Sequence, residues 1–321
     1  MKSATLLQRL RLPAVASPMF IASGVDLVVA QCQAGIVGAF PALNARPAAE
    51  LDRWIDRIEE ALARHDAQHP EALSAPYAIN LILHKTNDRL QADLDTCVRR
   101  KVPIVITSVG NPAKVVEAVH GYGGLVFHDV VNQRHARKAA GAGVDGLILV
   151  CAGAGGHAGR MSPFALVGEV KQWFDGLVLL GGAISKGEHV LAARAMGADL
   201  AYVGTRFLAT HEANVEAGYR RAVVDASADG IVYTDLFSGV HANYLKSSVA
   251  TAGYDPEQLP PKGAHDEDFG SESMHKSKVW RDIWSAGQGV GCIGEVKAAG
   301  DVVAEMRRDY AAARERLEPL P

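Results

Sequence analysis

The stretch Gly146-Leu-Ile-Leu-Val-Cys-Ala-Gly-Ala-Gly-Gly-His-Ala-Gly159 joins a short apolar run to a glycine-rich loop that contains one histidine. The run at 146–150 is typical of a strand that is buried on both faces of a parallel sheet. A strand that ends in glycines allows another molecule to approach the backbone closely. An imidazole in such a loop can transfer a proton near neutral pH. The stretch therefore predicts a buried parallel strand and, after it, an active-site loop around His157.

Similar apolar runs recur along the first two thirds of the chain and alternate with segments of helical periodicity. The candidate strands are 14–19, 36–40, 77–83, 103–108, 125–129, 146–150, 177–180 and 200–203. The helical segments between them include 49–64, 113–120, 134–142 and 187–196. Alternating strands and helices indicate a parallel sheet. About eight such units favour an α/β fold of the closed (β/α)8 TIM barrel type over an open doubly wound sheet.

The alternation stops after Phe207, and the remaining sequence predicts two further parts. Residues 210–226 have helical periodicity, 255–278 are polar with proline and glycine and predict a surface loop or a disordered stretch, and 295–317 predict a charged helix. We expect residues 1–209 to form the barrel. We expect 210–287 to form a smaller, mainly helical domain that covers its C-terminal face, and 288–321 to return to the barrel.

Composition excludes several classes of protein. The chain is 48% hydrophobic with a formal net charge of -3 and no basic cluster, so neither nucleic acid nor an anionic membrane is an expected partner. Its four cysteines are far apart without a CxxC pair, which favours reduced thiols over disulfides or a metal site. No secretory leader and no run of roughly 18 apolar residues is visible. We expect a soluble cytoplasmic protein; a homodimer is the assembly considered, although no sequence signal favours it.

Two turns late in the predicted barrel carry glycines where a phosphate group would bind. Gly181 and Gly182 follow the seventh candidate strand, and Gly204 and Thr205 follow the eighth. In TIM barrels the loops after strands seven and eight frequently bind phosphate through backbone N–H groups. Arg206 either pairs with that phosphate or forms a salt bridge at the barrel rim.

Five further segments are Ser17-Pro-Met-Phe20, Asn80-Leu81, Ala154-Gly-Gly-His-Ala-Gly159, Gly181-Gly182 and Gly197-Ala-Asp-Leu-Ala-Tyr-Val-Gly-Thr-Arg-Phe207. Taken together, they resemble the nitronate monooxygenase family, formerly called 2-nitropropane dioxygenases. The similarity runs from about Pro13 to the turn at Ala286-Gly-Gln-Gly289. The resemblance implies a (β/α)8 barrel with non-covalently bound FMN.

The resemblance also implies roles for individual residues. Residues implied to bind FMN are Met19, Phe20, Asn80, Gly155, Gly156, Gly181, Gly182, Gly204, Thr205 and Gln288. His157 matches the active-site histidine of the family, and His128 falls where several members place a histidine near the substrate. Tyr244 and Lys246, in the polar segment Ser238–Lys246, are weaker candidates for substrate contact, because a solvated loop explains them equally well.

The implied activity is oxidation of alkyl nitronates by dioxygen to a carbonyl compound and nitrite, and use of neutral nitroalkanes as well is left open. His157 would act as general base on the carbon next to the nitro group, or as a hydrogen-bonding anchor for the anionic nitronate. One alternative is an FMN-dependent NAD(P)H oxidoreductase of the enoyl-acyl-carrier-protein reductase or quinone reductase type. Another is a flavin-binding protein with little turnover.

Overall fold

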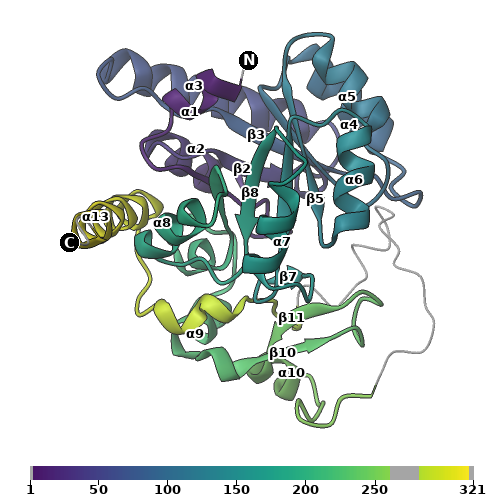
Figure 1. The fold of residues 1–321 in the computed structure, drawn as a ribbon, viewed down its shortest axis with the longest axis vertical. Helices are drawn as coiled ribbons and strands as arrows, with labels where there is room; N and C mark the ends of the chain where they lie inside the picture. The colour runs from purple at the N-terminus through teal and green to yellow at the C-terminus, as the bar shows by residue number, and fades with distance from the viewer. Residues whose placement is uncertain (1–2, 261–281, 318–321) are drawn as a thin grey trace.

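The computed structural model describes residues 3–260 and 282–317, and its centre is a parallel sheet that closes on itself (Figure 1). The strands are β1 (Ala14–Ala16), β2 (Gly38–Pro41), β3 (Tyr77–Ile82), β4 (Ile104–Ser108), β5 (Leu125–Val130), β6 (Gly146–Val150), β8 (Leu177–Gly181) and β9 (Leu200–Val203), in the order β1-β9-β8-β6-β5-β4-β3-β2. A parallel bridge between Val15 and Val37 joins the two ends of the sheet. The predicted TIM barrel is therefore confirmed.

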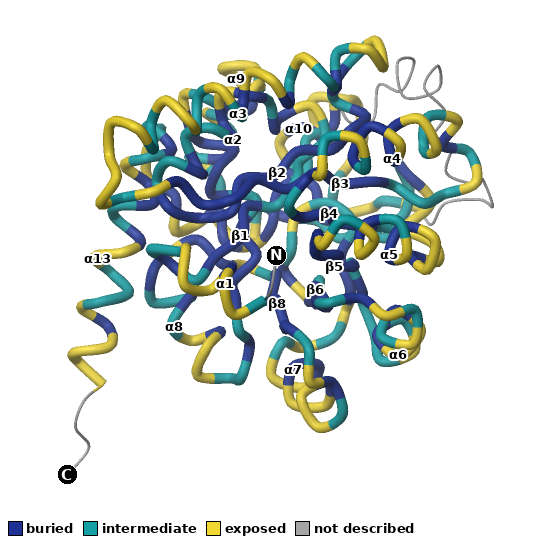
Figure 2. The backbone as a smooth tube through the Cα atoms, turned by 90° about the horizontal axis from the view of Figure 1, so that it is seen from above, coloured by how far each residue is buried: buried dark blue, intermediate teal, exposed yellow. Residues whose placement is uncertain are grey.

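Helices lie outside the strands and bury their inner faces against them. They are α2 (Val25–Gln33), α3 (Glu50–Gln68), α4 (Leu90–Arg99), α5 (Ala113–His120), α6 (Gln133–Gly141), α7 (Pro163–Val170) and α8 (Gly187–Ala195), with 3-10 turns η1 (Ala42–Asn44) and η2 (Thr205–Ala209). Figure 2 shows buried strands in the middle and helices whose outer sides are exposed. No helix within 3–260 or 282–317 is both long enough and apolar enough to span a bilayer.

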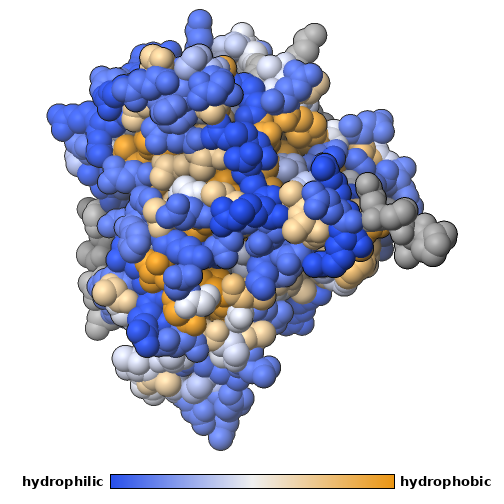
Figure 3. All heavy atoms as spheres, turned by 90° about the vertical axis from the view of Figure 1, so that its left-hand side faces the viewer, coloured by the Kyte–Doolittle hydropathy of each residue, from blue (hydrophilic) through white to orange (hydrophobic). Residues whose placement is uncertain are grey.

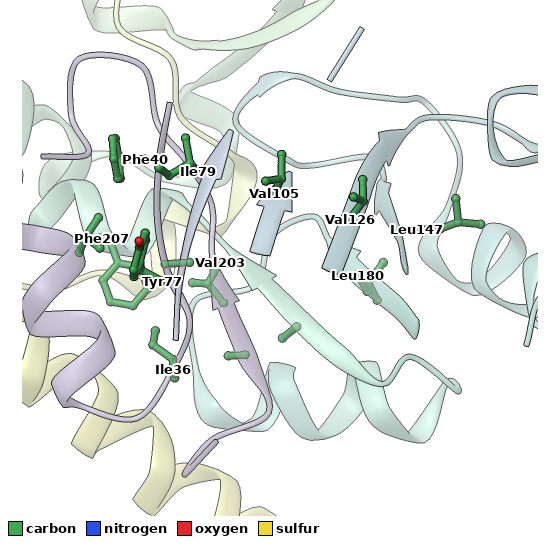
Figure 4. Packing of buried hydrophobic residues seen from close by; sticks show 14 of the residues in the cluster. Ile36, Phe40, Tyr77, Ile79, Val105, Val126, Leu147, Leu180, Val203 and Phe207 are labelled. Atoms are coloured by element: carbon green, nitrogen blue, oxygen red, sulfur yellow. The ribbon is translucent and has the colours of Figure 1, made fainter. Parts of the chain in front are cut away.

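The two faces of the barrel strands supply two separate hydrophobic clusters. Ile79, Val126 and Leu180 point outward and pack with residues of the surrounding helices (Figure 4). Their immediate neighbours Ala78, Phe127 and Leu179 point inward and fill the barrel interior. Side chains alternate in this way because successive residues of a strand face opposite sides of a sheet. Leu6 of α1 (Ser3–Gln8) joins the interior cluster.

The C-terminal helix α13 (Ala299–Leu317) returns to the barrel and packs against α8 and α2. Gly187 at the start of α8 makes this contact possible, because a Cβ there would clash with the carbonyl oxygen of Met306. Val302, Val303 and Met306 are buried at this contact. Figure 3 views the molecule from the side of these helices, where hydrophilic side chains predominate.

The segment over the C-terminal face of the barrel contains strands as well as helices. We call residues 210–260 and 282–287 the covering segment. It comprises α9 (Ala217–Asp225), η3 (Ala228–Gly230), β10 (Ile231–Thr234), β11 (Ala242–Leu245) and α10 (Lys246–Thr251), and η4 (Gln288–Cys292) follows it. β10 and β11 pair antiparallel. The expectation of a mainly helical cover missed this hairpin, and most of the polar stretch 255–278 lies outside the described residues.

Candidate active site

A cavity of about 1090 Å³ lies between the carboxyl ends of the barrel strands and the covering segment. Its walls include residues at the ends of β1, β3, β4, β5, β6, β8 and β9. Tyr219 and Trp284 line it from the covering segment, and their rings stack at 5.1 Å between centroids with 8° between the planes. Ligand sites in proteins commonly measure about 300–1,000 Å³. This cavity is therefore large enough for a cofactor together with a small substrate.

The His157 loop is hydrogen-bonded to the covering segment. Gly156 and His157 form a two-residue strand, β7 (Gly156–His157), that pairs antiparallel with β11. Asn243 of β11 is 2% exposed, and its Nδ2 donates to the carbonyl oxygen of Ala154 at 2.7 Å. The hydroxyl of Tyr233 in β10 donates to the carbonyl oxygen of Ala158 at 2.7 Å. Pairing with β11 and the side-chain hydrogen bonds from Asn243 and Tyr233 thus fix a loop whose glycines would otherwise make it mobile.

The hydrogen bonds of Ser238 indicate which nitrogen of the His157 ring carries the proton. The Ser238 Oγ lies 3.1 Å from His157 Nε2 and donates its single proton to the carbonyl oxygen of Val240 at 2.9 Å. Because that proton is used, Ser238 accepts a hydrogen bond from Nε2–H. In the neutral ring the lone pair then belongs to Nδ1, the nitrogen that can take up a proton.

Replacing Asn243 by alanine should loosen the His157 loop. The carbonyl oxygen of Ala154 would lose its buried donor, so we expect the free energy of unfolding to fall by about 1–3 kcal/mol. Chemical denaturation measures this change. Thr251→Ala, at an exposed position of α10 in the same segment, is the control and should change stability little. Equal stability of the two variants would show that the Asn243 bond does not hold the loop.

Bare backbone forms the cavity wall at the ends of β8 and β9. Gly182 has φ of +141°, and a Cβ there would lie 2.7 Å from the carbonyl oxygen of Ala152. A Cβ on Gly204 would lie 3.2 Å from the Cβ of Ser17. The Thr205 Oγ1 accepts a hydrogen bond from the N–H of Gly287 at 2.9 Å. Its own proton can therefore be donated to a ligand in the cavity.

Burial changes the protonation of two neighbouring residues of β5. It lowers the pKa of His128 to about 4, with a smaller contribution from His135, so this imidazole is neutral at neutral pH. His128 Nδ1 lies 2.7 Å from the Thr107 Oγ1, and the proton of that hydroxyl is donated to the carbonyl oxygen of Phe127. Burial raises the pKa of Asp129 to about 6, although a hydrogen bond from Ser108 acts in the opposite direction.

The structure brings most of the predicted site residues to one cavity. Those that line it are His157, His128, Met19, Phe20, Asn80, Gly155, Gly156, Gly181, Gly182, Gly204 and Thr205. Gln288, Tyr244 and Lys246 are not among its lining residues. Tyr244 is fully buried and donates to Ser238 at 3.3 Å, while Lys246 pairs with Glu257 at 2.6 Å.

Gln288 and Arg206 also lie away from the cavity lining. The side chain of Gln288 is exposed and lies against Gly153, while its backbone N–H donates to the Gly153 carbonyl oxygen at 2.9 Å. Arg206 is 5% exposed and lies 4.0 Å from Glu305 of α13. Of the two roles considered for Arg206, its position therefore favours the rim salt bridge.

Several residues of the site were missed in the sequence. Ser108 and Asp129 end β4 and β5 at the cavity, and Ser238 contacts His157 from the covering segment. The signal for the first two was available, since polar residues at the carboxyl ends of barrel strands face the catalytic side. Ser238 carried no such signal, because its contact joins positions 81 residues apart.

Comparison with known proteins identifies similar proteins across most of the chain. Residues 40–308 match the family model described as nitronate monooxygenase. A nitronate monooxygenase from Paraburkholderia phytofirmans is 27% identical, with 95% of this chain and 94% of that protein aligned. One from Neurospora crassa is also 27% identical, but the alignment spans only 66% of this chain and 60% of that protein. The structure of a nitroalkane oxidase from Streptomyces ansochromogenes has a TM-score of 0.79 at 22% identity, covering 98% of this chain and 100% of that one.

Proposed function

The chain belongs to the nitronate monooxygenase family of oxidoreductases, and we propose from this premise that it oxidises alkyl nitronates with dioxygen, using FMN, to a carbonyl compound and nitrite. One observation carries the proposal: His157 borders the same cavity as the bare glycines that end β8 and β9. A proton-transferring group and a place for a phosphate therefore open into one space. This arrangement suits a phosphorylated cofactor and a small substrate bound side by side.

The residues present fit an FMN group. Gly181, Gly182 and Gly204 offer backbone without side chains on the cavity wall, and Thr205 can add a hydroxyl donor. Met19 and Asn80 lie farther along the same wall, where an apolar surface and an amide suit a flat heteroaromatic ring. The N–H of Met19 bonds Ser23 at 2.9 Å, and its carbonyl oxygen accepts from Asn44 at 3.0 Å, so this segment is held in place. When bound, FMN supplies the electron acceptor and the site of reaction with dioxygen.

The side chains around the cavity carry out proton transfer, anion binding and the exclusion of water. With a neutral nitroalkane, His157 removes the proton from the carbon next to the nitro group, and the proton goes to Nδ1 because Nε2–H is bonded to Ser238. With a nitronate no base is needed, and a protonated His157 stabilises the anion instead. Tyr219 and Trp284 exclude water on the side of the covering segment.

An anaerobic titration tests this proposal against the reductase alternative. The purified protein should be yellow, and we expect a nitronate to bleach the flavin absorbance while NADH leaves it unchanged. Admission of dioxygen should then release nitrite in proportion to the nitronate consumed. Rapid bleaching by NADH with an inert nitronate would instead assign an NAD(P)H-dependent reductase. A yellow protein that neither compound bleaches would indicate a flavin-binding protein with little turnover.

A further inference from the structure

A chain of hydrogen bonds crosses the cavity wall between three neighbouring strands. Asn80 of β3 donates from Nδ2 to the Ser108 Oγ at 2.8 Å and to the carbonyl oxygen of Ile106 at 3.3 Å, which fixes the orientation of its amide. Ser108 of β4 donates its single proton to the Asp129 Oδ2 of β5 at 2.5 Å. All three side chains line the cavity. The carboxyl of Asp129 is therefore held at a fixed position in the wall.

The second oxygen of the Asp129 carboxyl group is buried without a hydrogen-bond donor among the described residues. Oδ1 of Asp129 has no accessible surface and no hydrogen-bond partner within the part of the chain that the structure describes. Leaving a buried carboxylate oxygen without a donor costs free energy, and a proton on the carboxyl removes most of that cost. The residue still borders the cavity, so its charge state acts directly on whatever is bound there.

The other titratable groups around the cavity do not neutralise a carboxylate at this position. Tyr202 of β9 faces it, and their mutual effect raises the pKa of the tyrosine beyond what burial alone does. His128 of β5 is neutral at neutral pH, and burial lowers the pKa of His135 in α6. Lys138, also in α6, lines the cavity but is exposed. No side-chain cation lies within ion-pair distance of Asp129 across residues 3–260 and 282–317.

We propose that Asp129 is a further functional residue of this site: a carboxyl group, held by Asn80 and Ser108, whose ionisation is sensed by the bound isoalloxazine. The inference assumes the flavin site proposed above. A carboxylate here would repel an anionic nitronate and would make the flavin a poorer electron acceptor, because both the bound anion and the reduced ring carry negative charge. The protonated form, which predominates below about pH 6, avoids both effects.

Flavin absorbance of the holoenzyme, recorded between pH 5 and pH 8, provides the test. Burial raises the pKa of Asp129 to about 6, so the acid keeps its proton below that pH and loses it above. The titration is made in a His157→Gln background, which removes the imidazole of the proposed base, and we expect one single-proton transition in the spectrum near pH 6. It should be absent in Asp129→Asn, which keeps the shape but cannot ionise. It should move to higher pH in Ser108→Ala, because the lost hydrogen bond stabilises the carboxylate. His135→Gln should keep it unchanged.

Each result of this titration decides the question. A pH-independent spectrum, or a transition that survives in Asp129→Asn, would overturn the role of Asp129 while leaving the flavin site intact. If Asp129→Asn does not fold, Ser108→Ala decides alone, since an unmoved transition contradicts the proposal. A chain that binds no flavin would overturn the proposed function and this role with it. The Michaelis constant for a nitronate provides a second readout, and its rise with pH should be smaller in Asp129→Asn than in the wild type.

Discussion

Replacing His157 by alanine should lower kcat for a neutral nitroalkane by about 10²–10⁴-fold, while the purified protein keeps its flavin. The loss is large because no base would then remain at the end of β7 to remove the proton. Flavin content is expected to stay the same, since the glycines at the ends of β8 and β9 remain in place. Steady-state kinetics and the visible spectrum of the same preparation measure the two quantities.

The choice of substrate separates the two roles of His157. A nitronate is already deprotonated, so a general base matters only for the nitroalkane, whereas an anchor matters for both. Loss of nitroalkane turnover alone would identify a base, and a raised KM for the nitronate as well would identify an anchor. His69→Ala, at an exposed position of the chain, is the matched control. Unchanged kinetics with both substrates would remove His157 from the chemistry.

Replacing Gly204 by aspartate should abolish flavin retention. A Cβ at this position already lies within 3.2 Å of Ser17 and 3.9 Å of the Met19 sulfur, so the side chain must extend into the cavity. The added carboxylate would then oppose a phosphate at close range, with a repulsion of about 1–4 kcal/mol at 4 Å depending on screening. The flavin to protein ratio after gel filtration measures the effect.

Gly204→Asn is the control for Gly204→Asp, because it adds nearly the same volume without the charge. We expect it to weaken flavin binding less than the aspartate does. If the aspartate variant folds and retains as much flavin as the wild type, the phosphate binds elsewhere. If both variants lose flavin equally, the effect is steric rather than electrostatic.

The barrel strands could be located from the sequence because their burial depends little on distant partners. The run at 146–150 and the run at 200–203 coincide with β6 and β9, since strands covered on both faces are apolar throughout. The run at 36–40 became β2 at Gly38–Pro41, a shift of one or two residues. The hairpin β10–β11 was missed, because its Tyr233 and Asn243 are polar side chains whose partners lie in the distant His157 loop.

The difference between local patterns and distant contacts also explains which site residues could be predicted from the sequence. Glycine and histidine in a loop after a strand are a local pattern, so the region around His157 and the glycines at 181–182 and 204 could be predicted. The chain from Asn80 through Ser108 to Asp129 is not local, because it forms only when three strands become neighbours in the sheet. Tyr244 was proposed as a substrate contact on composition alone, whereas it lies beneath Ser238 as a buried support.

The two-residue strand β7 limits how this enzyme can be recombined with its relatives. Gly156 and His157 belong to the loop that follows the barrel strand β6, yet their backbone is paired with β11 of the covering segment. A chimera that exchanges residues 210–260 alone would therefore join a foreign hairpin to the native loop and misalign the imidazole. The His157 loop and the β10–β11 hairpin must therefore be exchanged together. A change of substrate preference through the covering segment requires matching changes in both.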